Sequence, residues 1–505
     1  MAVSLVASQV QAPGVFIRET APGATPEIAT FNRLYLLGTA SQLASDRNAL
    51  EPYQIVSLAD FTNQFGGSSA VILNTLEYAF KFYPNAQIFY AAVQEAAQKS
   101  IAITLPVVAG DYSLTFDLGG GTTPITATYT AAADATAQQV ITSLLTGIND
   151  NTDLNNLLEI EADTNADGTP KYTDGVFFVR AKLPIATLPT ITSSANMQVT
   201  DRAAAEPPTA TDWTYAIANS FDEDLFQGYL CVPEAYYGLT KQSDRTAVQQ
   251  AAELFVNQQA YNWVSIVDSG PPTVIDDTDA LSTERDEYSS LKGHSWYIGP
   301  WPKDSDNDYV SPAVQQAMVA LKRNTSEGFV QPPAGSRYPL TGLKGLPFSA
   351  TTAQHSTLNQ KGVNILKNIR NRGVCVYGAR TLSSNAVYKF CNTRVILNVY
   401  ARSLYDTLAA SDLVFTTIDG EGILFNQVKA VADELCYRLW LAGAFFGATP
   451  EDAFLNICDR RNNPNLDLQS GAVQLTSYVT TSPTGERILA DIAPIPIGAL
   501  AAYAA

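Results

Sequence analysis

Apolar positions recur along the chain with two periods, one typical of strands and one typical of helices. From Leu34 a short apolar run predicts a buried strand, residues 68–82 carry apolar side chains at nearly helical spacing, and residues 88–93 predict a second strand. The rhythm returns after Phe221, with predicted strands at 228–232, 263–267 and 295–298 and predicted helices near 244–260 and 283–291. This alternation indicates an α/β fold with a largely parallel sheet covered by helices on both faces.

Two further helices have clear local signals. Ser311 is a good N-cap and Pro312 suits the first helical position, so a helix is predicted to begin there. A second helix is predicted over residues 425–446, and its apolar seam consists of Val428, Val431, Leu435 and Leu439. The Pro- and Gly-rich residues 331–348 separate the two helices and predict a long loop into a last domain.

Residues 97–205 have a different amino-acid composition, rich in Thr, Ala, Asp and Gly. Alternating apolar positions such as Tyr112, Leu114 and Phe116 indicate half-buried strands, and one helix is predicted over residues 135–148. Because the α/β rhythm stops before this region and resumes after it, the region is interpreted as a mostly-β domain inserted into the first one.

Both ends of the chain are interpreted as extended arms. Near the N-terminus, two Pro-Gly pairs flank the β-prone residues Val15, Phe16 and Ile17, a pattern that suits an arm better than a packed element. Near the C-terminus, the strand-like residues 486–492 include Ile488 and Ile492. An extended arm of this kind needs a partner.

The pattern therefore predicts a multidomain α/β chain with an α+β C-terminal domain. Its predicted parts are an N-terminal arm (1–30), an α/β domain (31–96 plus 206–350), an inserted mostly-β domain (97–205), a C-terminal domain (351–483) and a C-terminal arm (484–505).

Composition narrows the range of functions. The formal net charge of -18 argues against binding nucleic acid, which requires clustered Lys and Arg. Five widely spaced cysteines without a C-x-x-C pair indicate neither a disulfide framework nor a zinc site. No basic N-terminal region precedes an apolar segment, and no apolar run approaches the roughly 20 residues that span a bilayer. The expectation is a soluble, unsecreted protein without membrane insertion.

Candidate catalytic residues are few. The only histidines are His294 and His355, neither lies in a motif that would pair it with a nucleophile, and no G-x-S-x-G sequence occurs. The glycines at 119–121 lack the Lys-Ser/Thr of a phosphate loop, so they predict a turn. The chain is therefore predicted not to be an enzyme.

One metal site is worth testing. The residues Asp163, Asn165, Asp167 and Asp174 have the spacing of oxygen ligands in a calcium loop, although Asp174 replaces the usual Glu. Strand-like flanks mean that the same residues also fit a polar hairpin loop. Apart from this Ca²⁺, no cofactor is expected.

The most unusual local feature is a basic run in an acidic protein. Residues 1–350 contain 37 acidic and 18 basic side chains, whereas residues 351–505 contain 12 acidic and 13 basic ones. The run has eight basic residues and no acidic one: Lys361, Lys367, Arg370, Arg372, Arg380, Lys389, Arg394 and Arg402. It is either a solvated face balanced by acids elsewhere or a surface that docks on an acidic partner.

Several motifs in the last domain occur in the order and spacing of a known family. They are Leu358-Asn-Gln-Lys-Gly-Val-Asn-Ile-Leu, Arg372-Gly-Val-Cys-Val-Tyr-Gly-Ala-Arg-Thr-Leu, Leu439-Trp-Leu-Ala-Gly-Ala-Phe-Phe-Gly, and Ala453-Phe-Leu-Asn-Ile-Cys-Asp with Asn462, Asn463 and Gly471. Near the N-terminus, Ala12-Pro-Gly-Val-Phe-Ile-Arg-Glu and Ser57-Leu-Ala-Asp-Phe add to the series. The chain resembles contractile phage tail sheath proteins and the sheaths of related contractile injection systems, outside residues 97–205.

The resemblance implies a structural role in a virion tail or injection particle, after assembly in the bacterial cytoplasm. It implies a subtilisin-like middle domain without a catalytic triad, and hexameric rings that stack helically around a tail tube and contract to drive the tube through the target envelope. Terminal arms would add strands to neighbours. The C-terminal domain would lie against the tube protein, which makes the basic run a candidate tube contact. Baseplate and tail terminator proteins would be further partners.

Two alternatives stay open at the level of sequence. A surface decoration protein or adhesin would display the 97–205 domain and would be monomeric in solution. A degenerate hydrolase would use His294 and would cleave generic peptide or ester substrates.

Overall fold

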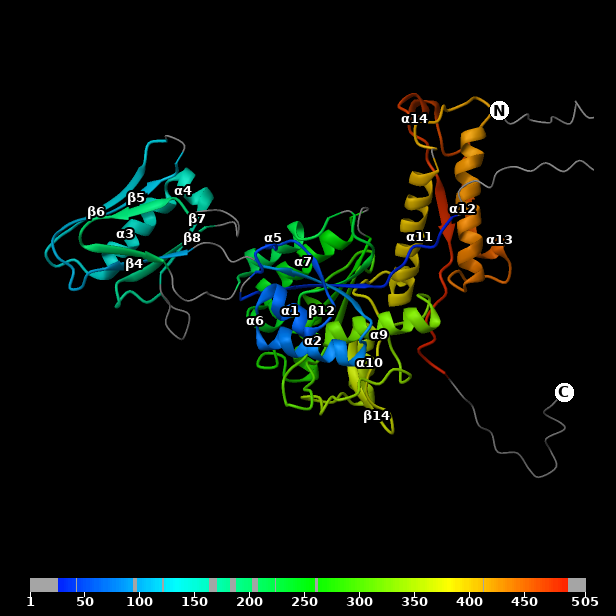
Figure 1. Ribbon diagram of the computed structural model, residues 1–505, viewed down its shortest axis with the longest axis horizontal. Helices are drawn as coiled ribbons and strands as arrows, with labels where there is room; N and C mark the ends of the chain where they lie inside the picture. The colour runs from blue at the N-terminus through cyan, green and yellow to red at the C-terminus, as the bar shows by residue number, and fades with distance from the viewer. Residues whose placement is uncertain are drawn as a thin grey trace, which may run out of the picture. The chain divides into compact units, whose positions relative to one another are not determined.

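The computed structural model describes residues 26–41, 43–93, 98–119, 122–162, 170–181, 188–201, 208–222, 224–258, 262–411 and 413–488. Their contacts divide the chain into two compact units. Within the described residues, one unit consists of 26–30 and 395–488, and the other lies between Phe31 and Arg394. Figure 1 shows the elements of each unit.

The larger unit contains an eight-stranded sheet among its described residues. In spatial order its strands are β15 (Gly373–Val376), β14 (Val363–Ile369), β13 (Ser295–Gly299), β12 (Val264–Asp268), β11 (Gly228–Cys231), β1 (Arg33–Gly38), β3 (Gln87–Ala92) and β2 (Tyr53–Ile55). Neighbouring strands are parallel except at the two ends of the sheet, where β14–β15 and β2–β3 are antiparallel. The predicted largely parallel sheet is therefore confirmed.

Helices cover both faces of this sheet. Adjacent residues of a strand point to opposite faces, and in β12 Val267 packs in one hydrophobic cluster with Val248 of α7 (Gln242–Val256). The next residue, Asp268, instead accepts hydrogen bonds from Ser311 Oγ at 2.9 Å and from Ala313 N at 2.7 Å, at the start of α9 (Pro312–Glu327). α7 and α9 therefore lie on opposite faces, as the strand and helix alternation predicted.

The larger unit has further helices among its described residues. They are α1 (Leu58–Phe65), α2 (Ala70–Phe82), α5 (Ala210–Asn219), α6 (Pro233–Gly238), α8 (Thr278–Asp286), α10 (Thr352–Lys361) and a short 3-10 helix, η2 (Ala386–Tyr388). The predicted start of α9 is confirmed, because Ser311 Oγ accepts a hydrogen bond from Val314 N. The prediction of a helix at 283–291 was wrong in position, since Asp277 caps α8 earlier by accepting from Asp279 N and Ala280 N.

The end of the larger unit differs from the predicted boundary at residue 350. β14 pairs with β13 and β15 pairs with β14, so both strands belong to the large sheet. The loop at 331–348 runs along the outer edge of β15, where Gly335 N and Leu340 N donate to the carbonyls of Val376 and Val374, both at 2.8 Å. The compact unit therefore continues to Arg394, because a non-local strand pairing extends it.

Residues 98–201 form strands and helices around their own hydrophobic cluster. One sheet has the order β10 (Met197–Asp201), β4 (Gln98–Ile103), β8 (Val176–Ala181), β7 (Leu158–Ala162), and the other has β6 (Ile125–Ala131), β5 (Gly110–Asp117), β9 (Thr190–Ser193). The helix predicted at 135–148 is α3 (Ala137–Asn149), and α4 (Thr152–Leu157) follows it. Buried side chains of α3, including Val140 and Leu144, belong to the cluster.

The smaller unit is built on two long helices and a strand pair. Its elements are α12 (Ile423–Leu441), α13 (Pro450–Ala453), β16 (Phe454–Ile457), α14 (Asn465–Gln469), β17 (Thr476–Val479) and most of α11 (Cys391–Ala410), which begins before the boundary. α12 ends five residues before its predicted end. The pattern did not predict α11, because buried polar residues such as Asn398 and Ser403 interrupt its apolar period. In the described parts of the chain, no helix is long and apolar enough to cross a membrane.

Candidate assembly surfaces

The described N-terminal residues lie along the two long helices of the smaller unit (Figure 1). Arg438 of α12 donates a hydrogen bond to the carbonyl of Pro26 at 2.9 Å, and Ala29 N donates to Ser403 Oγ of α11 at 2.8 Å. The arm candidates Val15, Phe16, Ile17 and Ile492 lie outside the described residues. Ile488 is described and is 94% exposed, in a segment, 482–488, that forms no helix or strand.

β16 and β17 form a two-stranded antiparallel sheet whose inner side is fixed to helices. Asn456 of β16 donates to Asp433 of α12 at 2.9 Å, and the hydroxyls of Ser477 and Tyr400 are 2.7 Å apart. Leu455 and Tyr478 face each other across the pair and are 55% and 60% exposed. No third strand among the described residues pairs with this sheet, so its outer edges have backbone groups that can accept an added strand.

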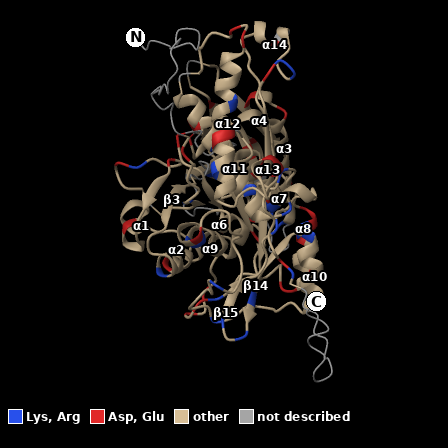
Figure 2. Cartoon of the chain, turned by 90° about the vertical axis from the view of Figure 1, so that its right-hand side faces the viewer, with Lys and Arg blue, Asp and Glu red and all other residues tan. Residues whose placement is uncertain are grey.

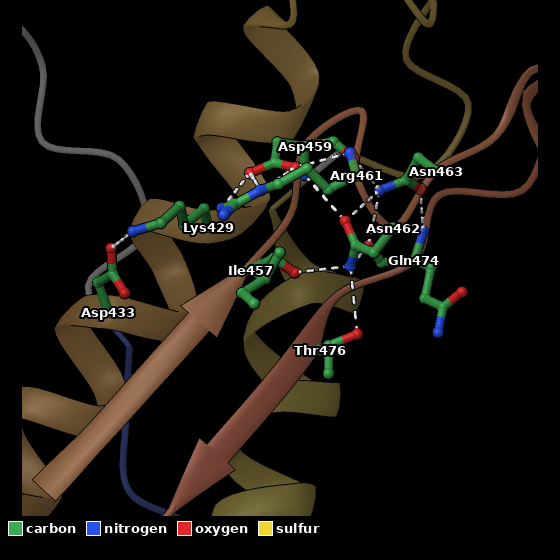
Figure 3. A network of polar contacts seen from close by, with 9 residues as sticks. All are labelled: Lys429, Asp433, Ile457, Asp459, Arg461, Asn462, Asn463, Gln474 and Thr476. Carbon is green, nitrogen blue, oxygen red and sulfur yellow. Dashed lines mark hydrogen bonds and ion pairs between the residues drawn. The ribbon is translucent and has the colours of Figure 1, made fainter.

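The connection between β16 and β17 is held by two asparagines (Figure 3). The Asn462 amide donates to the carbonyls of Ile457 at 2.8 Å and Gln474 at 3.0 Å. The Asn463 amide also donates to the Gln474 carbonyl at 3.0 Å, and its oxygen accepts from Gln474 N at 2.6 Å. A side-chain amide carries both the donor and the acceptor that this pairing with one backbone residue requires. These bonds fix the turn end of the strand pair, and they involve the Asn-Asn motif that carried part of the resemblance.

The basic run does not form one surface. Its first seven residues belong to the larger unit and Arg402 belongs to the smaller one, where it pairs with Asp406 at 2.9 Å. Lys361 pairs with Asp286 at 2.6 Å. The Lys367 ammonium lies 5.4 Å from the Tyr377 ring centroid, and Lys389 is half-buried.

Two of the basic residues are buried and two are exposed at a hairpin turn. Arg380 is 3% exposed and Arg394 is 6% exposed, and burial lowers the pKa of Arg394 to about 10. Arg370 and Arg372 are exposed in the turn between β14 and β15, where Figure 2 shows the basic positions in blue. Asn371 between them has a positive φ of 62°, which tightens the turn. This turn is the part of the run that is available to a partner.

The two histidines have structural surroundings. His294 is 2% exposed, its Nδ1 lies 2.9 Å from the Trp263 carbonyl oxygen, and burial lowers its pKa to about 3. His355 Nε2 lies 3.1 Å from the Tyr377 carbonyl oxygen. A cavity of about 630 Å³, lined by Trp213, Glu234 and other residues, contains neither histidine in its wall. The arrangement offers no histidine base to a substrate in that cavity.

The predicted calcium loop is only partly described. Asp163, Asn165 and Asp167 lie outside the described residues. The Asp174 carboxylate forms a salt bridge with Lys171, and this hydrogen bond lowers the pKa of Asp174. Elsewhere in the described chain no group of three potential metal-binding side chains occurs. Calcium binding stays a prediction, and Lys171 is the ion that Ca²⁺ would have to replace at Asp174.

Comparison with solved structures found similarity along nearly the whole chain. A chain of the anti-feeding prophage (AFP) helical sheath in contracted state is 16% identical, with a TM-score of 0.54 and a match that covers 96% of this chain and 99% of that chain. A chain of the PVC sheath complex, from an extracellular contractile injection system in contracted state, is 13% identical, with a TM-score of 0.54 over 96% and 98% of the two chains. The fold is that of contractile sheath proteins.

This chain is also similar to a chain in the structure of the AFP baseplate. The identity is 16%, the TM-score is 0.54, and the match covers 96% of this chain and all of that chain. Searches of protein-family models and of curated proteins found no match. At this level of identity the similarity establishes the fold alone.

Proposed function

We propose that this chain is a structural, non-catalytic subunit of a contractile sheath in a virion tail or injection particle. The observation that carries the proposal is the fold match over 96% of the chain to a sheath in the contracted state. Subunits would form hexameric rings that stack around a tail tube, and contraction would drive the tube through the target envelope. The energy would be stored in subunit conformation, so no nucleotide would be consumed.

Strand addition is the proposed link between subunits. The strand pair β16–β17 has outer edges without a described partner, and arms carrying Val15, Phe16, Ile17, Ile488 and Ile492 would supply further strands. Backbone hydrogen bonds made in this way join subunits while each compact unit moves as a body. The asparagine-fixed turn would keep the accepting strands in register during that movement.

The tube contact is proposed to include the exposed arginines of the basic run. Arg370 and Arg372 are the best candidates, because both are exposed on a tight turn. Exposed ion pairs contribute about 0–1 kcal/mol each, so they are easily exchanged when the sheath moves along the tube. Baseplate and tail terminator proteins would bind the two ends of the polymer.

The experiment that tests the proposal is deletion of residues 1–20. We expect the shortened chain to fold with unchanged circular dichroism but to form no long polymers in negative-stain electron microscopy, alone or with the tube protein. Cross-striated cylinders are expected from the full chain. Normal cylinders from the deletion variant would refute strand exchange, and dispersed monomers of the full chain with the tube present would favour the decoration protein.

A further inference from the structure

β6 (Ile125–Ala131) is an open sheet edge that lacks the usual protection against pairing. It pairs on one side with β5, and no described residue pairs with its other side. All seven of its residues are uncharged, and none is Pro. The side chains of Thr126, Thr128 and Thr130 are exposed, while Ala127 and Ala131 are buried in the hydrophobic cluster of residues 98–201. A long, uncharged and β-prone edge of this kind is a template for another strand.

Three other sheet edges among the described residues carry protection that β6 lacks. β2 has only three residues, which limits any ladder built on it. The outer edge of β15 is covered by hydrogen bonds from Gly335 N and Leu340 N. β7 carries the exposed charge of Glu159. Because sequences normally block sheet edges in one of these ways, an unblocked edge indicates that pairing is used.

The sequence of β6 is nearly symmetric about Thr128. We propose that β6 pairs antiparallel with β6 of a second copy of this chain, with the two Thr128 residues opposite each other. On the exposed face Thr126 then faces Thr130 of the second copy, which gives three Thr-Thr contacts in a row. On the other face Ala127 meets Tyr129 of the second copy and Ile125 meets Ala131. Cross-strand Thr-Thr and aliphatic-aromatic contacts are favourable, and the pairing brings no like charges together within the strands.

The symmetry of this contact decides which copies it joins. An isologous contact requires a twofold axis between the partners. Neighbours in a polar stack of rings are not related by such an axis, so the β6 contact joins free subunits or copies in two separate particles. The inference therefore does not depend on the proposed sheath function, and either can fail alone.

The contact should be weak at low salt. Residues 98–201 contain 11 acidic and four basic side chains, so two such domains repel each other. Screening reduces this repulsion as the Debye length falls from about 30 Å at 0.01 M salt to about 8 Å at 0.15 M. We expect self-association to increase with salt, in contrast to a contact held by ion pairs.

Thiol cross-linking of the full chain tests the register. Residues opposite each other in antiparallel strands have Cα atoms about 4.5–5.5 Å apart, which suits a disulfide. Thr128→Cys should therefore give a disulfide between two copies under mild oxidation, identified as the position-128 peptide pair by mass spectrometry. The matched control is Thr192→Cys, an exposed threonine on the same outer face in β9. The five native cysteines are buried.

The expected result is at least about tenfold more cross-link for Thr128→Cys than for Thr192→Cys, since a tenfold ratio corresponds to about 1.4 kcal/mol of preference. Equal cross-linking of the two variants would overturn the proposal. In sedimentation velocity, Thr128→Lys should weaken the salt-promoted dimer and Thr192→Lys should leave it unchanged. A wild-type chain with no salt-promoted dimer, or a Thr128→Lys variant that still dimerises, would also overturn it.

Discussion

Asp268 is expected to make the larger unit less stable as the pH rises from about 4 to about 7. Its carboxylate, at the end of β12, is completely buried and accepts hydrogen bonds from two donors, the Ser311 hydroxyl and Ala313 N, and no cation of the described residues pairs with it. Burial raises its pKa to about 7. The folded protein therefore binds this proton more tightly than the unfolded chain, whose Asp pKa is about 3.9. The stabilisation is present at low pH and is lost between about pH 4 and pH 7.

The magnitude follows from the two pKa values. Between pH 5 and pH 8, this group alone should lower the free energy of unfolding by about 3 kcal/mol, because each pKa unit corresponds to about 1.36 kcal/mol. In Asp268→Asn the titration is absent. Asn Oδ1 still accepts from Ala313 N, and Asn Nδ2 can donate to Ser311 Oγ. The stability of the variant relative to the wild type should therefore increase by about 3 kcal/mol between pH 5 and pH 8.

The assay is urea unfolding of the monomeric chain at both pH values, followed by tryptophan fluorescence. The quantity compared is the stability difference between wild type and Asp268→Asn, because other titrating groups cancel in that difference. Asp306→Asn is the control, since the Asp306 side chain is exposed in a loop. A difference that stays the same at pH 5 and pH 8, within about 0.5 kcal/mol, would refute the reasoning.

Three further predictions concern other parts of the chain. Glu284→Gln should cost about 3–5 kcal/mol in thermal unfolding, because it leaves the guanidinium of Arg245, 2.6 Å away and 1% exposed, as an uncompensated buried charge. Asn463→Ala should speed hydrogen exchange in the β16–β17 connection and cost about 1–3 kcal/mol, since it leaves backbone groups without partners; unchanged exchange would contradict the role given to this amide. The double variant Arg370→Glu and Arg372→Glu should weaken co-sedimentation with the tube protein without changing the melting temperature, and unaltered binding would remove this turn from the tube contact.

Local sequence determined the elements whose signals lie within one or two turns of chain. The start of α9 follows from Ser311 and Pro312 alone, because capping depends on neighbouring residues. The strand and helix alternation likewise predicted the parallel sheet and its two covered faces. The motifs of the last domain were sufficient to indicate the sheath fold, although they did not reveal where each motif lies.

Only the tertiary structure decided how distant segments combine. β14 and β15 joined the large sheet through pairing with β13, more than 60 residues earlier in the chain, and no local period records such a partner. The sequence pattern did not predict α11 because Asn398 and Ser403 are polar, and polar residues in a pattern are taken to be exposed. In the structure both side chains are buried. The basic run likewise looked like one surface but divides between buried arginines, an exposed turn and a second unit. Charge and period are properties of a segment, whereas burial and pairing depend on what the rest of the chain brings to it.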